Sequence, residues 1–164
     1  MTYKHLSFVS LFAVAALSAS AQRNVENFNF GWQFHRGNID VTAINTSDGS
    51  WETINVPHDF QISQPWVAPA ANESEDNSDG ASNFKSRLSA RGFKEMGDGW
   101  YVKTYTPAAD MKGRRILLDF EGIMYVGDVY LNGKRIGGTD YGYLGFDIDV
   151  SKLLKYGQAN TIAV

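Results

Sequence analysis

The sequence "DVYLNGKRIGG" at residues 128–138 decides the fold class, because it has the pattern of a β-hairpin closed by a two-residue turn. Asn132 and Gly133 both tolerate the positive φ angles that a type I′ turn requires at its central positions. The turn then pairs the three residues before it with the three residues after it as antiparallel strands. Val129 and Leu131 share one face of the first strand, while Asp128, Tyr130 and Asn132 share the other.

Short segments with the same alternation lie on both sides of the hairpin and are bounded by Gly and Pro. The segments predicted as strands are residues 28–37, 51–57, 99–107, 114–122, 143–150 and 160–164. In the first of them, Phe28, Phe30, Trp32 and Phe34 fall on one parity, which predicts one apolar face. Residues 114–122 form a nearly continuous apolar run, as expected of a central strand.

Helical periodicity is scarce in this sequence. Ser151 is a candidate N-cap for one short turn that ends at Gly157, and residues 107–114 predict a loop or a single turn. Many short strands at close spacing therefore predict an all-β fold, an antiparallel β-sandwich.

Residues 1–21 have the layout of a secretory signal peptide. Lys4 lies in a short basic start, an apolar run follows at residues 6–17, and Ala19 and Ala21 supply the small residues of a cleavage site. The run is short for a bilayer span; a membrane anchor and a core helix are the alternatives. We expect an exported protein, periplasmic or extracellular, that has no membrane span after cleavage.

The composition excludes several kinds of partner. The chain has no cysteine, so we expect neither disulfides nor a cysteine-linked lipid anchor. Its net charge of -3 and the lack of a basic stripe argue against nucleic acid. The histidines His5, His35 and His58 are scattered and no metal- or phosphate-binding motif occurs. We therefore expect no metal and no cofactor in this chain.

Two pairs of residues suggest chemistry. His58 and Asp59 follow Pro57, but adjacent residues of an extended chain point in opposite directions, so we do not expect a dyad. The structural alternative is a turn whose side chains satisfy backbone groups. Asp147 and Asp149 lie two apart on one strand face and offer oxygen ligands to a cation. A solvated strand face is the simpler interpretation of that pair.

A long polar segment at about residues 69–99 interrupts the strand pattern, acidic in its first half and basic in its second. Loops of this length inside a domain are usually functional or disordered. We expect residues 72–82 to be mobile. The second half has four apolar side chains that predict packing against the domain: Phe84, Leu88, Phe93 and Met96.

Taken in order, the motifs V-P-H-D-F, G-W-Y, D-F-E-G, V-Y-L-N-G-K, Y-G-Y and F-D-I-D-V cover residues 28–164. This arrangement resembles the N-terminal sugar-binding, jelly-roll domain of glycoside hydrolase family 2, and its β-galactosidase-type members most of all. The resemblance implies that residues 22–164 form this domain of an exported glycosidase acting on a carbohydrate. It also implies packing on immunoglobulin-like and TIM-barrel domains that carry the catalytic glutamates of a retaining enzyme.

No residue of this chain matches a catalytic motif of the family, so we assign none and expect the chain alone to be inactive. His58, Asp59, Tyr141 and Tyr143 are the candidates for positions near the substrate; packing at a domain interface is the alternative for each. We also expect a truncated domain that lacks its last strand or strands. A stand-alone carbohydrate-binding module and a structural interaction domain are the alternative functions.

Overall fold

The computed structural model describes residues 23–66, residue 94 and residues 97–164. The expected signal peptide and most of the polar segment, including residues 72–82, lie outside this part of the chain. The described elements are β1 (Trp32–Arg36), β2 (Glu52–Ile54), β3 (Gly99–Tyr105), η1 (Ala109–Met111), β4 (Leu117–Phe120), β5 (Gly127–Leu131), β6 (Lys134–Thr139), β7 (Phe146–Asp149) and β8 (Asn160–Ala163).

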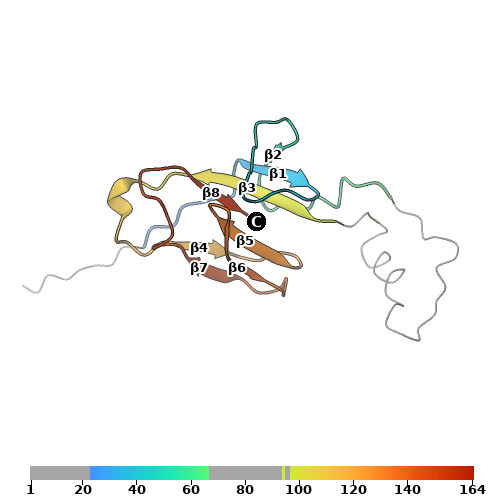
Figure 1. Cartoon of the computed structure of the whole chain (residues 1–164). Helices are drawn as coiled ribbons and strands as arrows, with labels where there is room; N and C mark the ends of the chain where they lie inside the picture. The colour runs from blue at the N-terminus through green and yellow to red at the C-terminus, as the bar shows by residue number, and fades with distance from the viewer. Residues whose placement is uncertain (1–22, 67–93, 95–96) are drawn as a thin grey trace, which may run out of the picture.

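The strands form two layers, shown in Figure 1, and every pairing between them is antiparallel. One layer is a six-stranded sheet in the order β2-β1-β3-β8-β5-β6, and the other pairs β4 with β7. The predicted all-β, antiparallel sandwich is confirmed. Within the described ranges, the only helical segment is the 3-10 turn η1, and no helix is long and apolar enough to cross a membrane.

The hydrophobic core lies between these layers. Its buried members come from the first and the last third of the sequence: Trp32, Phe34, Ile54, Leu131, Val150, Leu154 and Ile162. Leu118 of β4 and Ile148 of β7 pack against this cluster from the two-stranded layer. Period-two alternation explains the arrangement of β7, where Ile148 faces inward and the aspartates on either side are exposed, as predicted.

The hairpin forms with the predicted turn. Asn132 has φ 52° and Gly133 has φ 80°, the left-handed values of a type I′ turn. Val129 and Leu131 are both buried. The register differs from the expectation by one residue, because a bulge between Val129 and Tyr130 pairs Val129 with Gly137.

Two expectations about strands are wrong. Residues 114–122 do not supply a central strand, because among the strands that the structure describes β4 pairs only with β7, and Leu117 is exposed. Phe30 does not share the core face of Trp32 and Phe34; it is 61% exposed. Gly31 has φ 69° and turns the chain just before β1 begins, so the alternation does not extend back to Phe30.

Candidate functional site

His58 lies on the turn that follows β2, against β1 and β3 of the large sheet. Its Nδ1 atom is 3.0 Å from the hydroxyl oxygen of Tyr101, and its ring centroid is 5.0 Å from that of Phe34. Phe34 also contacts Tyr101, with ring centroids 5.0 Å apart. The rings of Phe34 and Tyr101 leave the imidazole half-buried, and within the described ranges its Nε2 atom has no hydrogen-bond partner.

Asp59 faces a different partner from His58. Its Oδ1 atom accepts a hydrogen bond from the backbone N–H of Gln61 at 2.9 Å, which closes a local turn. The two side chains therefore do not form a dyad, as predicted. Their proximity to substrate stays a prediction.

Burial of Tyr101, and to a smaller extent the negative charge of Asp59, raises the pKa of the Tyr101 hydroxyl to about 12. The hydroxyl is therefore protonated at neutral pH and acts as a hydrogen-bond donor. It also lies 3.4 Å from the backbone oxygen of His58. These contacts join the turn after β2 to β3 through the uncharged Tyr101 hydroxyl.

Tyr141 and Tyr143 lie on the connection from β6 to β7. Their ring centroids are 5.7 Å apart with the planes tilted by 59°, and both side chains are exposed. Thr139 Oγ1 accepts a hydrogen bond from the Tyr141 backbone N–H at 3.1 Å and lies 3.0 Å from the Tyr141 carbonyl oxygen. These contacts fix the start of the connection, so the two rings project from a defined backbone.

The structure does not bring the four candidate residues together. His58 and Asp59 lie beside β1 and β3, whereas Tyr141 and Tyr143 follow β6 at the opposite edge of the six-stranded sheet. Strands β8 and β5 separate the two groups. The two pairs therefore cannot line one small sugar pocket within this domain.

An open depression of about 390 Å³, which sequence reasoning missed, is lined by Gly31, Gln33, Thr46, Val102, Lys103 and Thr104. Its charged member is already engaged: the Lys103 ammonium lies 4.5 Å from the ring centroid of Phe28 and donates to the carbonyl of Phe30. The sequence signal that was available for this depression is Lys103, which lies on a predicted strand and contacts the aromatic residues Phe28 and Trp32 of another predicted strand. These contacts support a structural role for Lys103.

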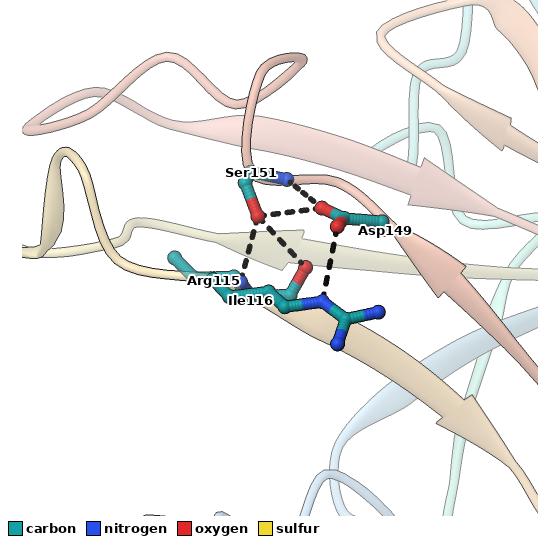
Figure 2. Close-up of polar contacts among 4 residues, drawn as sticks. All are labelled: Arg115, Ile116, Asp149 and Ser151. Carbon is teal, nitrogen blue, oxygen red and sulfur yellow. Dashed lines mark hydrogen bonds and ion pairs between the residues drawn. The ribbon is translucent and has the colours of Figure 1, made fainter. Parts of the chain in front are cut away.

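Asp149, the second aspartate of the β7 pair, is also engaged, as Figure 2 shows. Asp149 Oδ1 accepts hydrogen bonds from the backbone N–H and the hydroxyl of Ser151, and Oδ2 lies 3.3 Å from Arg115 Nε. The Ser151 hydrogen bonds, and then Arg115, hold the pKa of Asp149 below its usual value. Ser151 Oγ in turn accepts from the Ile116 backbone N–H at 2.8 Å. This network joins β7 to the start of β4, which opposes the cation-site interpretation.

The described part of the chain holds no group of three metal-ligating side chains. The arrangement is that of a scaffold in which His58 is half-buried and the tyrosine connection is exposed.

Comparison with known proteins identifies relatives of this sandwich. Residues 84–164 match the family described as glycosyl hydrolase 2 galactose-binding domain-like. A β-glucuronidase of Formosa agariphila is 33% identical over 88% of this chain, which corresponds to 14% of that protein. A β-galactosidase of Bacteroides ovatus is 28% identical over 93% of this chain and 16% of that protein.

Solved structures show the same relationship. A glycosyl hydrolase family 2 member from Bacteroides cellulosilyticus superposes with a TM-score of 0.62 and 29% identity over 84% of this chain and 17% of that one. A β-glucuronidase of glycoside hydrolase family 2 gives 0.61 and 31% over 84% of this chain and 13% of that one. The chain thus spans less than a fifth of the length of these relatives.

Proposed function

Residues 84–164 belong to the glycosyl hydrolase 2 galactose-binding domain-like family, and on that premise we propose that the chain is the non-catalytic N-terminal domain of an exported glycoside hydrolase. One observation carries this proposal: nearly the whole chain matches a small share, 14% to 16%, of much longer glycosidases. In this function residues 22–164 form one supporting domain, which packs on downstream immunoglobulin-like and TIM-barrel domains.

The parent enzyme hydrolyses terminal β-glycosidic bonds. β-Galactosides are the substrates favoured by the sequence motifs, and β-glucuronides are the second class because relatives named for both activities match the same residues. Retaining hydrolysis needs two carboxyl groups about 5–5.5 Å apart. The domain has no role in that step; it supports the barrel that performs it.

Activity assays test this proposal directly. The chain alone and the complete polypeptide that carries it are each incubated with 4-nitrophenyl β-D-galactoside and 4-nitrophenyl β-D-glucuronide. We expect turnover of at least one substrate by the complete polypeptide and none by the chain alone. Turnover by the chain alone would contradict a purely supporting role, and inactivity of the complete polypeptide on β-glycosides would contradict the proposed activity.

A stand-alone carbohydrate-binding module is the second candidate, and the exposed tyrosines 141 and 143 favour it because aromatic rings stack on sugar faces. Affinity electrophoresis of the chain in gels containing galactans separates the two functions. A module is retarded by the polysaccharide and released by Tyr143→Ala, with Phe30→Ala as the control at an exposed ring outside the tyrosine connection. A supporting domain migrates equally with and without glycan.

Export is proposed from the pattern at residues 1–21 alone. Mass spectrometry of the secreted protein is expected to find Gln22 at the N-terminus. Ala21→Tyr places a large side chain at the cleavage position and is expected to leave the leader attached. A wild-type protein that retains Met1 in the cytoplasm would refute export.

A further inference from the structure

The hairpin turn contains the only Asn-Gly pair of the sequence, Asn132 followed by Gly133. Such a pair is prone to deamidation, because glycine has no Cβ atom to shield its backbone nitrogen from the preceding asparagine side chain. In this reaction the Gly133 nitrogen attacks the Asn132 Cγ atom, and the proton of that nitrogen leaves with Nδ2 as ammonia. Water then opens the cyclic imide, which leaves aspartate or isoaspartate at position 132.

In the folded chain, three hydrogen bonds hold Asn132 against the start of β8. Its backbone N–H donates to the Thr161 carbonyl at 2.8 Å, and its Oδ1 atom accepts from the Thr161 N–H at 3.1 Å. Its Nδ2 atom, which is the leaving group of the reaction, donates to Asn160 Oδ1 at 3.0 Å. The side chain must give up the last two bonds before the imide ring closes, so the fold opposes deamidation.

Asn160 is held in one orientation and does not adapt to a change at position 132. Its Oδ1 atom accepts from the Lys155 N–H at 2.9 Å, and its Nδ2 atom donates to the carbonyl oxygens of Lys155 and Gln158 at 2.9 and 3.0 Å. Asn160 has no exposed surface. An ionised aspartate at position 132 has no N–H to donate, and its charge would face the fixed Oδ1 atom of Asn160. Isoaspartate would also add one carbon to the backbone of a two-residue turn.

We propose that Asn132 is a modification site controlled by the fold. It deamidates when the turn separates from β8, and the product then prevents the turn from binding β8 as before. The reaction needs no enzyme, and its co-reactant is water. Chains that open often therefore accumulate a permanent change in the hairpin. This property is independent of the activity proposed above, because it requires only the hairpin and β8.

Peptide mapping measures the conversion at this one position. Trypsin releases residues 116–134, and Asn132 is the only side-chain amide in that peptide, so a mass change from amide to acid reports Asn132 alone. The complete polypeptide that carries the chain is incubated at mildly alkaline pH, in buffer and in guanidinium chloride. We expect conversion to be at least about tenfold slower in buffer, because the closed turn does not react. Equal rates in the two solutions would overturn the proposal.

The effect of the product on the hairpin is tested with two variants of the complete polypeptide. Asn132→Asp reproduces the aspartate product, and Asn45→Asp is the matched control. Asn45 Oδ1 accepts from the Ser47 backbone N–H at 3.0 Å in a local turn, and a carboxylate accepts the same bond.

Hydrogen exchange of the backbone amides of residues 128–136 is compared between these variants and the wild type. Asn132→Asp is expected to speed exchange at least about tenfold, because the turn opens more often. Asn45→Asp is expected to leave exchange at the wild-type rate. Wild-type exchange in Asn132→Asp, or an equal increase in both variants, would refute the proposed effect of deamidation on the hairpin.

Discussion

Asn132 and Asn160 are joined side chain to side chain, with Asn132 Nδ2 donating to Asn160 Oδ1 across 3.0 Å. Asn132 is the first residue of the hairpin turn, and Asn160 begins β8. The Asn132 side chain also accepts from the Thr161 backbone N–H at 3.1 Å. The turn residue therefore has two roles, because it adopts positive φ and fastens the hairpin to the neighbouring strand.

Asn160 is fully buried and its side chain makes several hydrogen bonds, so its replacement is expected to lower the free energy of unfolding. It has no exposed surface, accepts from the Lys155 N–H at 2.9 Å and donates to the carbonyls of Lys155 and Gln158. Asn160→Leu strands these buried groups, so we expect a loss of roughly 3 kcal/mol in the free energy of unfolding. Urea unfolding followed by tryptophan fluorescence measures it. The exposed Gln158→Ala is the control, and a loss as small as the control's would contradict the role.

Gly137→Ala is expected to fit only when the neighbouring Ile148 side chain is made smaller. A Cβ there would lie 2.7 Å from Ile148 Cδ1, between β6 and β7. Gly137→Ala is predicted to destabilise the chain by about 1–3 kcal/mol through overpacking. Ile148→Val removes that δ carbon, so the double variant should lose less than the sum of the single variants. Additive losses in denaturant unfolding would show that the clash is relieved elsewhere.

Protonated Tyr101 contributes to the stability of the folded chain, and this contribution is lost at alkaline pH. Its pKa is raised from 10 in the unfolded chain to about 12 in the folded one, so the folded state binds the proton more tightly. This contribution is fully present below pH 10 and is lost as the pH rises from 10 through 12. Unfolding at pH 9 and pH 11.5 should therefore show a larger loss for wild type than for Tyr101→Phe. The exposed Tyr141→Phe should behave as wild type; equal losses in all three proteins would rule out the effect.

Asp119 and Asp147 are directly opposite each other on the exposed face of the β4–β7 pair. Like charges in this position repel, so Asp147→Asn is expected to stabilise the chain by about 0.5 kcal/mol at low salt. The gain should shrink in 1 M NaCl, because salt screens exposed charges. Asp110→Asn, on η1, is the matched control. Thermal unfolding at both salt concentrations checks this, and a gain that does not depend on salt would exclude repulsion as the cause.

The hairpin and β7 show what local sequence predicts well. Asn132 and Gly133 adopt the expected φ angles because few residues tolerate that region. The exposed aspartates of β7 follow from the geometry of a pleated strand. The failures at Phe30 and β4 have a different origin. An apolar run is compatible with a central strand or with a short strand in a second layer, and its own residues do not distinguish them.

The candidate site was predictable only in part. The turn of His58 and Asp59 follows from local chain geometry, and Asp59 does bind a backbone N–H two residues on. The bond from His58 to Tyr101 spans 43 residues and has no local signal. The same is true of the contact between the β4–β5 and β6–β7 connections, where Gly142 lies against Met124.

By itself, the sequence determined the all-β class, the hairpin turn and the inward face of most strands, because backbone preference and period-two alternation act between neighbouring residues. Only the tertiary structure decided that β8 lies between β3 and β5, that Asn160 is sealed at that junction, and that the β4–β5 and β6–β7 connections lie against each other. Those outcomes depend on contacts between segments that are distant in the sequence. Such contacts are set by the close packing of the whole domain and not by the preferences of neighbouring residues.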